Sequence, residues 1–106
     1  MRKIQAEILG RIYDGKPFAA GNTALVRDSN GDSILSLHGN PIAKFKAGCH
    51  TPYAVSWAGW VTHTTQSRLN ILPGVVACVR NFTPYINGKP VGESGWFDLN
   101  GKEVCA

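Results

Sequence analysis

Charged residues are scarce in this chain, and no apolar run is long. Only 17% of the 106 residues are charged, against roughly 25% in an average globular domain. No apolar stretch approaches the roughly 20 residues that span a bilayer, and Gln5, Glu7 and Arg11 interrupt the apolar residues at the start of the chain. The sequence therefore predicts neither a signal peptide nor a membrane helix, and no membrane partner.

Cysteine is too sparse to form a structural framework. Cys49, Cys78 and Cys105 are odd in number and show no C-x-x-C spacing, so neither a disulfide scaffold nor a zinc site is expected. Cys78 lies among β-branched residues and is predicted to be a small buried apolar residue. This cysteine usage favours the reducing cytoplasm.

The chain also lacks a set of residues with catalytic spacing. Hydrolysis needs a convergent group such as Ser-His-Asp, a carboxylate pair or a set of metal ligands. Most carboxylates, such as Asp14, Asp28 and Asp32, fall in stretches that turn formation already explains. His50 and His63 have no partner cysteine pair. We therefore expect no enzyme activity, no cofactor and no metal ion.

What the chain does contain suits one small core with many turns. Hydrophobic residues make up 43% of the sequence, and residues 1–106 have the usual size of a single domain. The 12 glycines and 6 prolines indicate short elements. The net charge of +4 favours weak attraction to polyanions.

Alternating apolar residues predict short strands in the first half of the chain. Residues 3–13 alternate mostly with period two and predict a strand, although a short helix also fits. Residues 23–27 and 33–37 flank a turn with Asn-Gly, the strongest short hairpin signal. Residues 41–46 extend this hairpin into a meander, and residues 53–57 are rich in strand-forming residues.

The second half adds one short helix before more strands. Thr64 is a suitable N-cap for a helix near residues 64–72, and Pro73-Gly74 ends it. Residues 75–86 and 96–104 are β-rich again. We predict an α+β fold, a mainly antiparallel sheet of about six or seven short strands connected by hairpins in a meander, with one short helix.

Three segments give the chain a resemblance to small proteins encoded by tailed bacteriophages. These segments are Asn22-Thr23, residues 37–43 (LHGNPIA) and residues 59–70 (GWVTHTTQSRLN), of which the last is the most specific. The aromatic strand and Phe-Asp turn at Phe97-Asp98 are similar as well, so the resemblance spans most of residues 22–99. It implies a phage protein in the host cytoplasm and implies no activity.

The stretch from residue 62 to residue 70 is the strongest candidate for a binding site. A helix N-terminus has unpaired N–H groups and a partial positive charge, and here hydroxyl groups surround it. Nucleic-acid phosphates suit such a site, and an aromatic ring with nearby basic residues suits unpaired bases. The predicted nucleic-acid contacts are Trp60, Thr62, Thr64, Thr65, Ser67, Arg68, Lys44 and Lys46.

Structural interpretations of the helix residues stay open beside the functional one. Thr64 or Thr65 can simply cap the helix. Arg68 can pair with a carboxylate such as Asp98, while Asn70 bonds a neighbouring turn.

The aromatic residues and His38 also have structural interpretations. In so small a domain Trp57 is expected in the core, Trp60 is equally compatible with core or surface, and Trp96 is expected to close the core. His38 is expected to make a turn hydrogen bond, next to Gly39-Asn40, which tolerate positive φ.

Three functions fit these features. The first is binding of nucleic acid through the helix N-terminus and a basic, aromatic surface. The second is modulation of a host enzyme or defence system through an aromatic and apolar surface, and the third is a role in the virion or its assembly. The expected partner is accordingly nucleic acid or a host protein.

Overall fold

The computed structural model describes residues 10, 18–20, 22–27, 31–47, 49 and 51–104. These residues form ten short strands and the helix α2, which confirms the predicted α+β class. The strands outnumber the predicted six or seven because four of them are only two residues long. The elements are β1 (Phe18–Ala20), β2 (Thr23–Arg27), β3 (Ser33–Leu37), β4 (Asn40–Phe45), β5 (Ala54–Val55), α2 (His63–Asn70), β6 (Ala77–Arg80), β7 (Thr83–Ile86), β8 (Lys89–Pro90), β9 (Trp96–Phe97) and β10 (Glu103–Val104).

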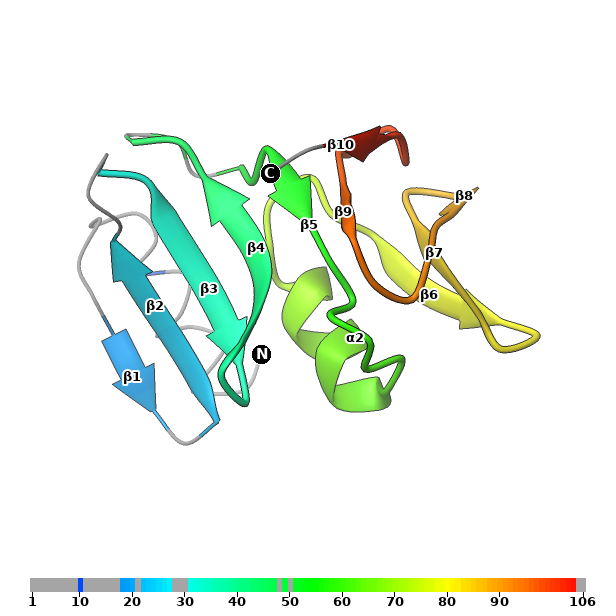
Figure 1. Cartoon of the computed structure of the whole chain (residues 1–106), viewed down its shortest axis with the longest axis horizontal. Helices are drawn as coiled ribbons and strands as arrows, with labels where there is room; N and C mark the ends of the chain where they lie inside the picture. Colours follow the sequence, from blue (N-terminus) through cyan, green and yellow to red (C-terminus); the bar gives the residue numbers. More distant parts are fainter. Residues whose placement is uncertain are drawn as a thin grey trace.

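The strands form two antiparallel sheets (Figure 1). The larger sheet has the order β1-β2-β3-β4-β5-β9-β10, and the smaller one has the order β6-β7-β8. Strands β2 and β3 pair as the predicted hairpin, and β4 extends it into the predicted meander. Helix α2 contacts β4 of the larger sheet and β6 of the smaller one, so it joins the two (Figure 1).

A row of buried apolar side chains crosses one face of the larger sheet. Leu25 lies opposite Leu35, and the row continues through Ala43, Val55 and Phe97. All five side chains are buried. Because successive side chains of a strand point to opposite faces, this register fixes which residues face α2 and which face away from it.

Strand β4 contains a β-bulge that turns two consecutive side chains to the buried face. Leu35 pairs with Ala43, but the next residue, Ser36, pairs with Pro41, which leaves Ile42 as an extra residue. Both Ile42 and Ala43 are buried. Bulges redirect side chains next to functional sites, and this one brings Ile42 to the side of the sheet that carries α2.

Helix α2 begins one residue earlier and ends two residues earlier than predicted. Its N-cap is Thr62, which has an extended backbone (φ −128°, ψ 164°) and accepts a hydrogen bond from the Thr65 N–H at 3.3 Å. The prediction of Thr64 or Thr65 as the cap is therefore wrong, since both lie within the helix. Within the helix, Arg68 and Leu69 face the interior.

The end of α2 is bound to the smaller sheet by one side chain. The Asn70 amide donates to the Ala77 carbonyl at 2.8 Å, and its oxygen accepts from the Ala77 N–H at 2.7 Å. Asn70 thus takes the place of a neighbouring strand beside β6. The expected bond from Asn70 to a neighbouring turn is therefore wrong in its target, because Ala77 is the first residue of β6.

Loss of the cap gives a first testable effect. Thr62→Ala is expected to lower the free energy of unfolding by about 1 kcal/mol, because the Thr65 N–H loses its acceptor. Thr62→Ser keeps the hydroxyl and is expected to retain most of that stability. Urea denaturation measures both, and equal stabilities for the two variants would contradict the capping role.

Several predictions fall on residues that the structure does not describe. The strand or short helix expected over residues 3–13 lies outside the described part, except for Gly10, which is helical. His50 and Cys105 also lie outside the described part. Cys78 is half-buried rather than buried, because Ala77 and Val79 occupy the core-facing positions of β6. Among the described residues, no helix has the length and apolar character to cross a membrane.

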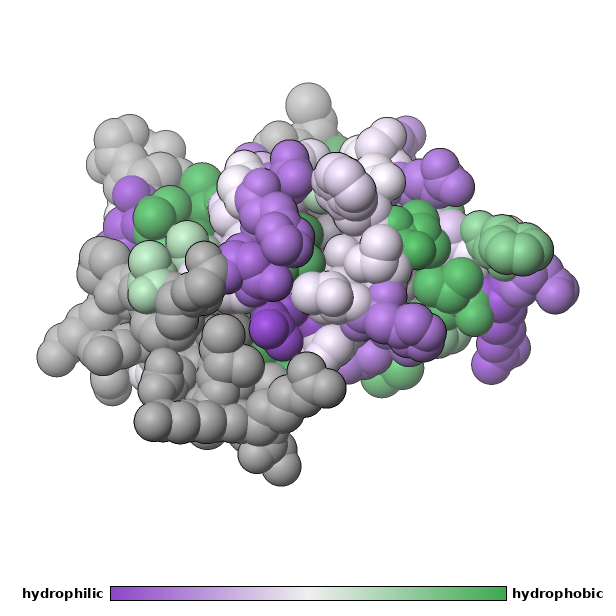
Figure 2. Space-filling model, turned by 90° about the horizontal axis from the view of Figure 1, so that it is seen from below, coloured by the Kyte–Doolittle hydropathy of each residue, from purple (hydrophilic) through white to green (hydrophobic). Residues whose placement is uncertain are grey.

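Among the residues coloured in Figure 2, hydrophilic side chains lie across the middle of the face, and hydrophobic side chains are found toward the end that carries the smaller sheet. Four large hydrophobic side chains are exposed in the described part of the chain. They are Val26, Trp60, Val76 and Phe82.

Candidate functional site

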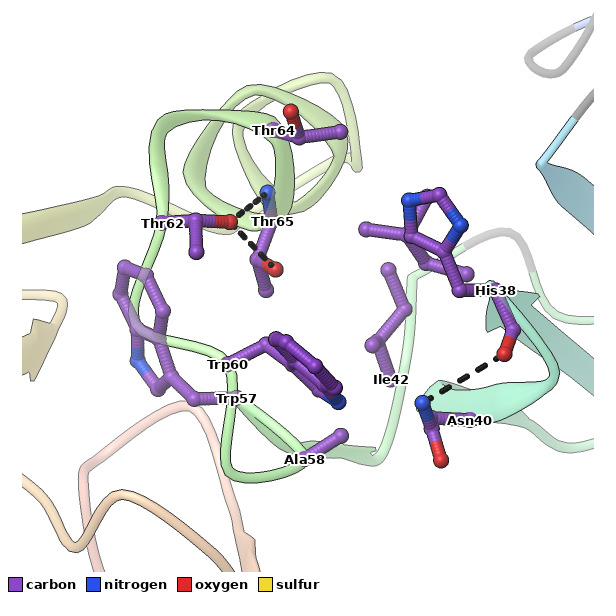
Figure 3. Close-up of a pocket in the computed structure, with 10 residues that line it drawn as sticks. His38, Asn40, Ile42, Trp57, Ala58, Trp60, Thr62, Thr64 and Thr65 are labelled. Atoms are coloured by element: carbon purple, nitrogen blue, oxygen red, sulfur yellow. Dashed lines mark hydrogen bonds between the residues drawn. The ribbon is translucent and has the colours of Figure 1, made fainter.

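The start of α2 borders a cavity of about 450 Å³ (Figure 3). Small-ligand sites in proteins usually measure about 300–1,000 Å³. Three parts of the fold line it, as Figure 3 shows: the helix start, the end of β3 with β4, and the loop after β5. Their lining residues are respectively Thr62, Thr64 and Thr65; Leu37, His38, Asn40 and Ile42; and Trp57, Ala58 and Trp60.

Two tryptophans on a tight turn give the cavity its aromatic character. The backbone N–H of Trp60 donates to the backbone carbonyl of Trp57 at 2.8 Å. The two residues between them have positive φ, 54° for Ala58 and 78° for Gly59. Trp57 is fully buried, as predicted, and its Nε1 is the buried side-chain polar atom without a hydrogen-bond partner within the described part of the chain. Trp60 is 58% exposed. The turn therefore places one indole in the core and offers the other to solvent.

A polar cleft of about 320 Å³ adjoins this cavity. Its lining side chains are Asn22, His63, Thr64, Ser67 and Arg68. Thr64 lines both spaces. An aromatic cavity and a hydroxyl-rich, basic cleft thus lie side by side at one helix start.

Arg68 connects α2 to β2 inside the protein. It is only 6% exposed, and its Nε donates to Thr23 Oγ1 at 3.1 Å. Thr23 Oγ1 in turn donates to Asn22 Oδ1 at 3.0 Å, and Asn22 Nδ2 lies 3.4 Å from His38 Nε2. These contacts fix the positions of the helix, β2 and the β3–β4 turn relative to one another, and the helix, the turn and Asn22 just before β2 line the site.

The segments that carry the phage resemblance meet here. Asn22-Thr23, residues 37–43 and residues 59–70 are distant in sequence, yet each contributes to the cavity, the cleft or the contacts between them. The three segments that carry the resemblance therefore lie together in one region of the structure.

A model of the Kyanoviridae Gp96 protein family matches residues 1–104. The chain belongs to this family. The Gp96 family is a family of cyanophage proteins, so the resemblance to phage proteins is confirmed. Neither the curated proteins nor the solved structures contain a match to the chain. The family name specifies no activity, so the geometry of the site has to supply the functional argument.

Two of the predicted contacts lie apart from the others in this Gp96 protein. Lys44 follows the core-facing Ala43, so it points to the opposite face of the sheet, where its Nζ lies 4.8 Å from the Trp96 ring centroid. The Nζ of Lys46 lies 4.6 Å from the Tyr53 ring centroid and 4.0 Å from an oxygen of Asp32. The structure does not bring either lysine together with Trp60 and the threonines.

The remaining predicted contacts divide by exposure. Thr62 and Thr64 are exposed, and Ser67 is half-buried. Thr65 is buried, with its hydroxyl 3.2 Å from that of Thr62, so like Arg68 it supports the site from within.

Sequence reasoning missed four polar residues that the structure brings to the site. Asn22 and His63 line the polar cleft, and His38 and Asn40 line the cavity. All four belong to the segments of the resemblance, which was the signal that pointed to them. His38 has φ 53° and Gly39 φ 79°, so the positive φ expected at Gly39-Asn40 lies one residue earlier.

The described residues contain no group of three His, Cys, Asp or Glu side chains that could hold a metal ion. Asp98 accepts hydrogen bonds from the backbone N–H groups of Asn100 and Lys102. This carboxylate therefore shapes its own turn, as predicted for acidic residues in this chain.

Proposed function

We propose that this Gp96 protein binds single-stranded nucleic acid and holds one nucleotide at the start of α2. The observation that carries the proposal is the pairing of an aromatic cavity with a polar cleft through Thr64. A nucleotide consists of the same two parts, a flat base and a phosphate. Base stacking on aromatic side chains contributes about 1–3 kcal/mol per base and suits proteins that bind single strands.

The base belongs in the cavity. Trp60 offers its exposed indole for stacking, while His38 and Asn40 carry hydrogen-bonding groups on the opposite wall. A base inside a duplex reaches such a cavity only after it is flipped out, which costs a few kcal/mol. The geometry therefore favours single strands over duplexes.

The phosphate belongs in the polar cleft. Helix N-termini attract anions because their first N–H groups lack partners within the helix, and the first turn of α2 contains no acidic residue. The exposed side chains of His63 and Thr64 border the cleft, and the charge of Arg68 lies at its base. In this proposal the protein acts by binding alone, in the host cytoplasm, where phage nucleic acid is present.

Titration of tryptophan fluorescence with single- and double-stranded DNA and RNA tests the proposal. We expect single strands to quench the fluorescence and to bind more tightly than duplexes. The affinity should fall between about 50 and 200 mM salt, as phosphate contacts require. Absence of binding to every oligonucleotide at the lower salt would contradict the proposal and would favour a host protein as partner.

Trp60→Ala locates the binding within the molecule. The variant is expected to weaken single-strand affinity about tenfold, the effect of losing one stacked base. Trp96→Ala is the matched control, because Trp96 lies on the opposite face of the larger sheet. Circular dichroism confirms folding of both variants. Equal losses of affinity in the two variants would exclude the cavity as the base site.

A further inference from the structure

Three hairpin turns in the described part of the chain share one backbone form, but one of them lacks the glycine that the other two have. Each turn has two residues, and both have positive φ: His38-Gly39, Asn81-Phe82 and Asn87-Gly88. Turns of this form favour glycine, which adopts positive φ without steric cost. Two of the turns have glycine as their second residue, whereas the β6–β7 turn has Phe82 at φ 64°.

Packing does not account for Phe82 either. Its side chain is 93% exposed, the highest value among the exposed large hydrophobic residues of the described chain. It lies at the tip of the hairpin that projects from one end of the molecule (Figure 1), the end where Figure 2 shows hydrophobic side chains on the surface. Residues held in an unfavourable backbone conformation cluster at functional sites, and neither the turn nor the core accounts for this exposed ring.

The surroundings of Phe82 indicate the chemistry of that partner. Residues 75–90 include Arg80 and Lys89 but no aspartate or glutamate. Pro84 and Ile86 are buried, so Tyr85 between them faces outward, and the Arg80 guanidinium lies 5.8 Å from its ring centroid. The hairpin therefore presents aromatic rings and positive charge together, which complement unpaired bases and their phosphates.

We infer that Phe82 is a second base-stacking contact for single-stranded nucleic acid, with Arg80 beside it on the phosphate backbone. This inference rests on the proposed function, because it extends the same strand from the α2 cavity to the hairpin tip. The longest dimension of the molecule is 36 Å. Single-strand binding folds cover about 4–16 nucleotides, and a strand toward the upper part of that range is thus long enough to use both contacts.

Phe82→Gly tests the inference, because it gives this turn the residue that the other two turns have. The variant is expected to have a melting temperature equal to or above that of the wild type. Its affinity for a strand of about twelve nucleotides should fall about tenfold. Its affinity for a strand of about four nucleotides, which occupies only the cavity, should stay unchanged. Phe82→Tyr, which keeps the ring, should restore the affinity for the longer strand.

The outcomes separate this inference from the proposed function. Wild-type affinity of Phe82→Gly for the longer strand would overturn the hairpin contact and leave the α2 site intact. A lower melting temperature for Phe82→Gly would also overturn it, since Phe82 would then support the fold. If the wild type bound neither strand, the proposed function itself would fail.

Discussion

Asn87→Ala is expected to lower the free energy of unfolding by about 3 kcal/mol, through lost hydrogen bonds and backbone strain. The Asn87 side chain accepts from the Val76 N–H at 2.6 Å and donates to the carbonyls of Gly74 and Leu99 at 3.0 and 2.8 Å. It therefore connects the β7–β8 turn to the segment after α2 and to the β9–β10 turn. Alanine leaves these three backbone groups without that partner.

The backbone contribution is separable from the hydrogen bonds. Asn87 has φ 50°, a region that asparagine tolerates better than alanine. Asn87→Gly removes the side chain without adding strain and is expected to be about 1 kcal/mol more stable than Asn87→Ala. Urea denaturation monitored by tryptophan fluorescence measures both variants. Stabilities within about 0.5 kcal/mol of the wild type, as for ordinary surface changes, would show that Asn87 does not hold these segments together.

Arg68→Ala is the other change with a large expected effect. It should lower the free energy of unfolding by about 2–4 kcal/mol, because the packing of the side chain and its hydrogen bond to Thr23 are lost. The side chain is nearly buried and joins α2 to β2. Its loss also displaces the two walls of the site, so single-strand binding should weaken even at temperatures where the variant is folded. Arg27→Ala is the matched control, since Arg27 is exposed on the same strand as Thr23.

The same variant distinguishes two roles for Arg68. If Arg68 only contacted phosphate, Arg68→Ala would leave the free energy of unfolding unchanged. It would then lower the slope of affinity against salt by about one unit. Its burial predicts instead a clear loss of stability relative to Arg27→Ala. Equal unfolding free energies for the two variants would contradict the anchoring role.

Local signals in the sequence were sufficient for much of the fold. The hairpin over residues 23–27 and 33–37 was predictable because alternation and its Asn-Gly turn act within a few residues. The start of α2 was not, because Thr62, Thr64 and Thr65 are nearly equivalent as caps. The choice between them depends on which residues of the helix must face the core. The bulge at Ile42 is likewise a property of the pairing with β3 and leaves no local signal.

The residues of the site at the start of α2 were predictable, but the residues that other segments contribute to it were not. The structure places around the cavity and the polar cleft six residues that were chosen for their side chains: Trp60, Thr62, Thr64, Thr65, Ser67 and Arg68. Lys44 was added because of its charge, but strand alternation sends it to the other face. Asn22 was missed because its contact with His38 spans 16 residues. Phe82 was predicted to lie within a β-rich stretch, whereas Asn81 and Phe82 have positive φ and form a turn.

The indole N–H signals of the three tryptophans provide the most direct test of the α2 site. In a ¹H–¹⁵N spectrum each indole gives one signal, and single Trp→Phe variants assign them. Addition of a single strand of about four nucleotides is predicted to shift the signals of Trp57 and Trp60, which line the cavity, and to leave Trp96 unchanged. Shifts confined to Trp96, or no shift at any of the three, would contradict nucleotide binding at the start of α2.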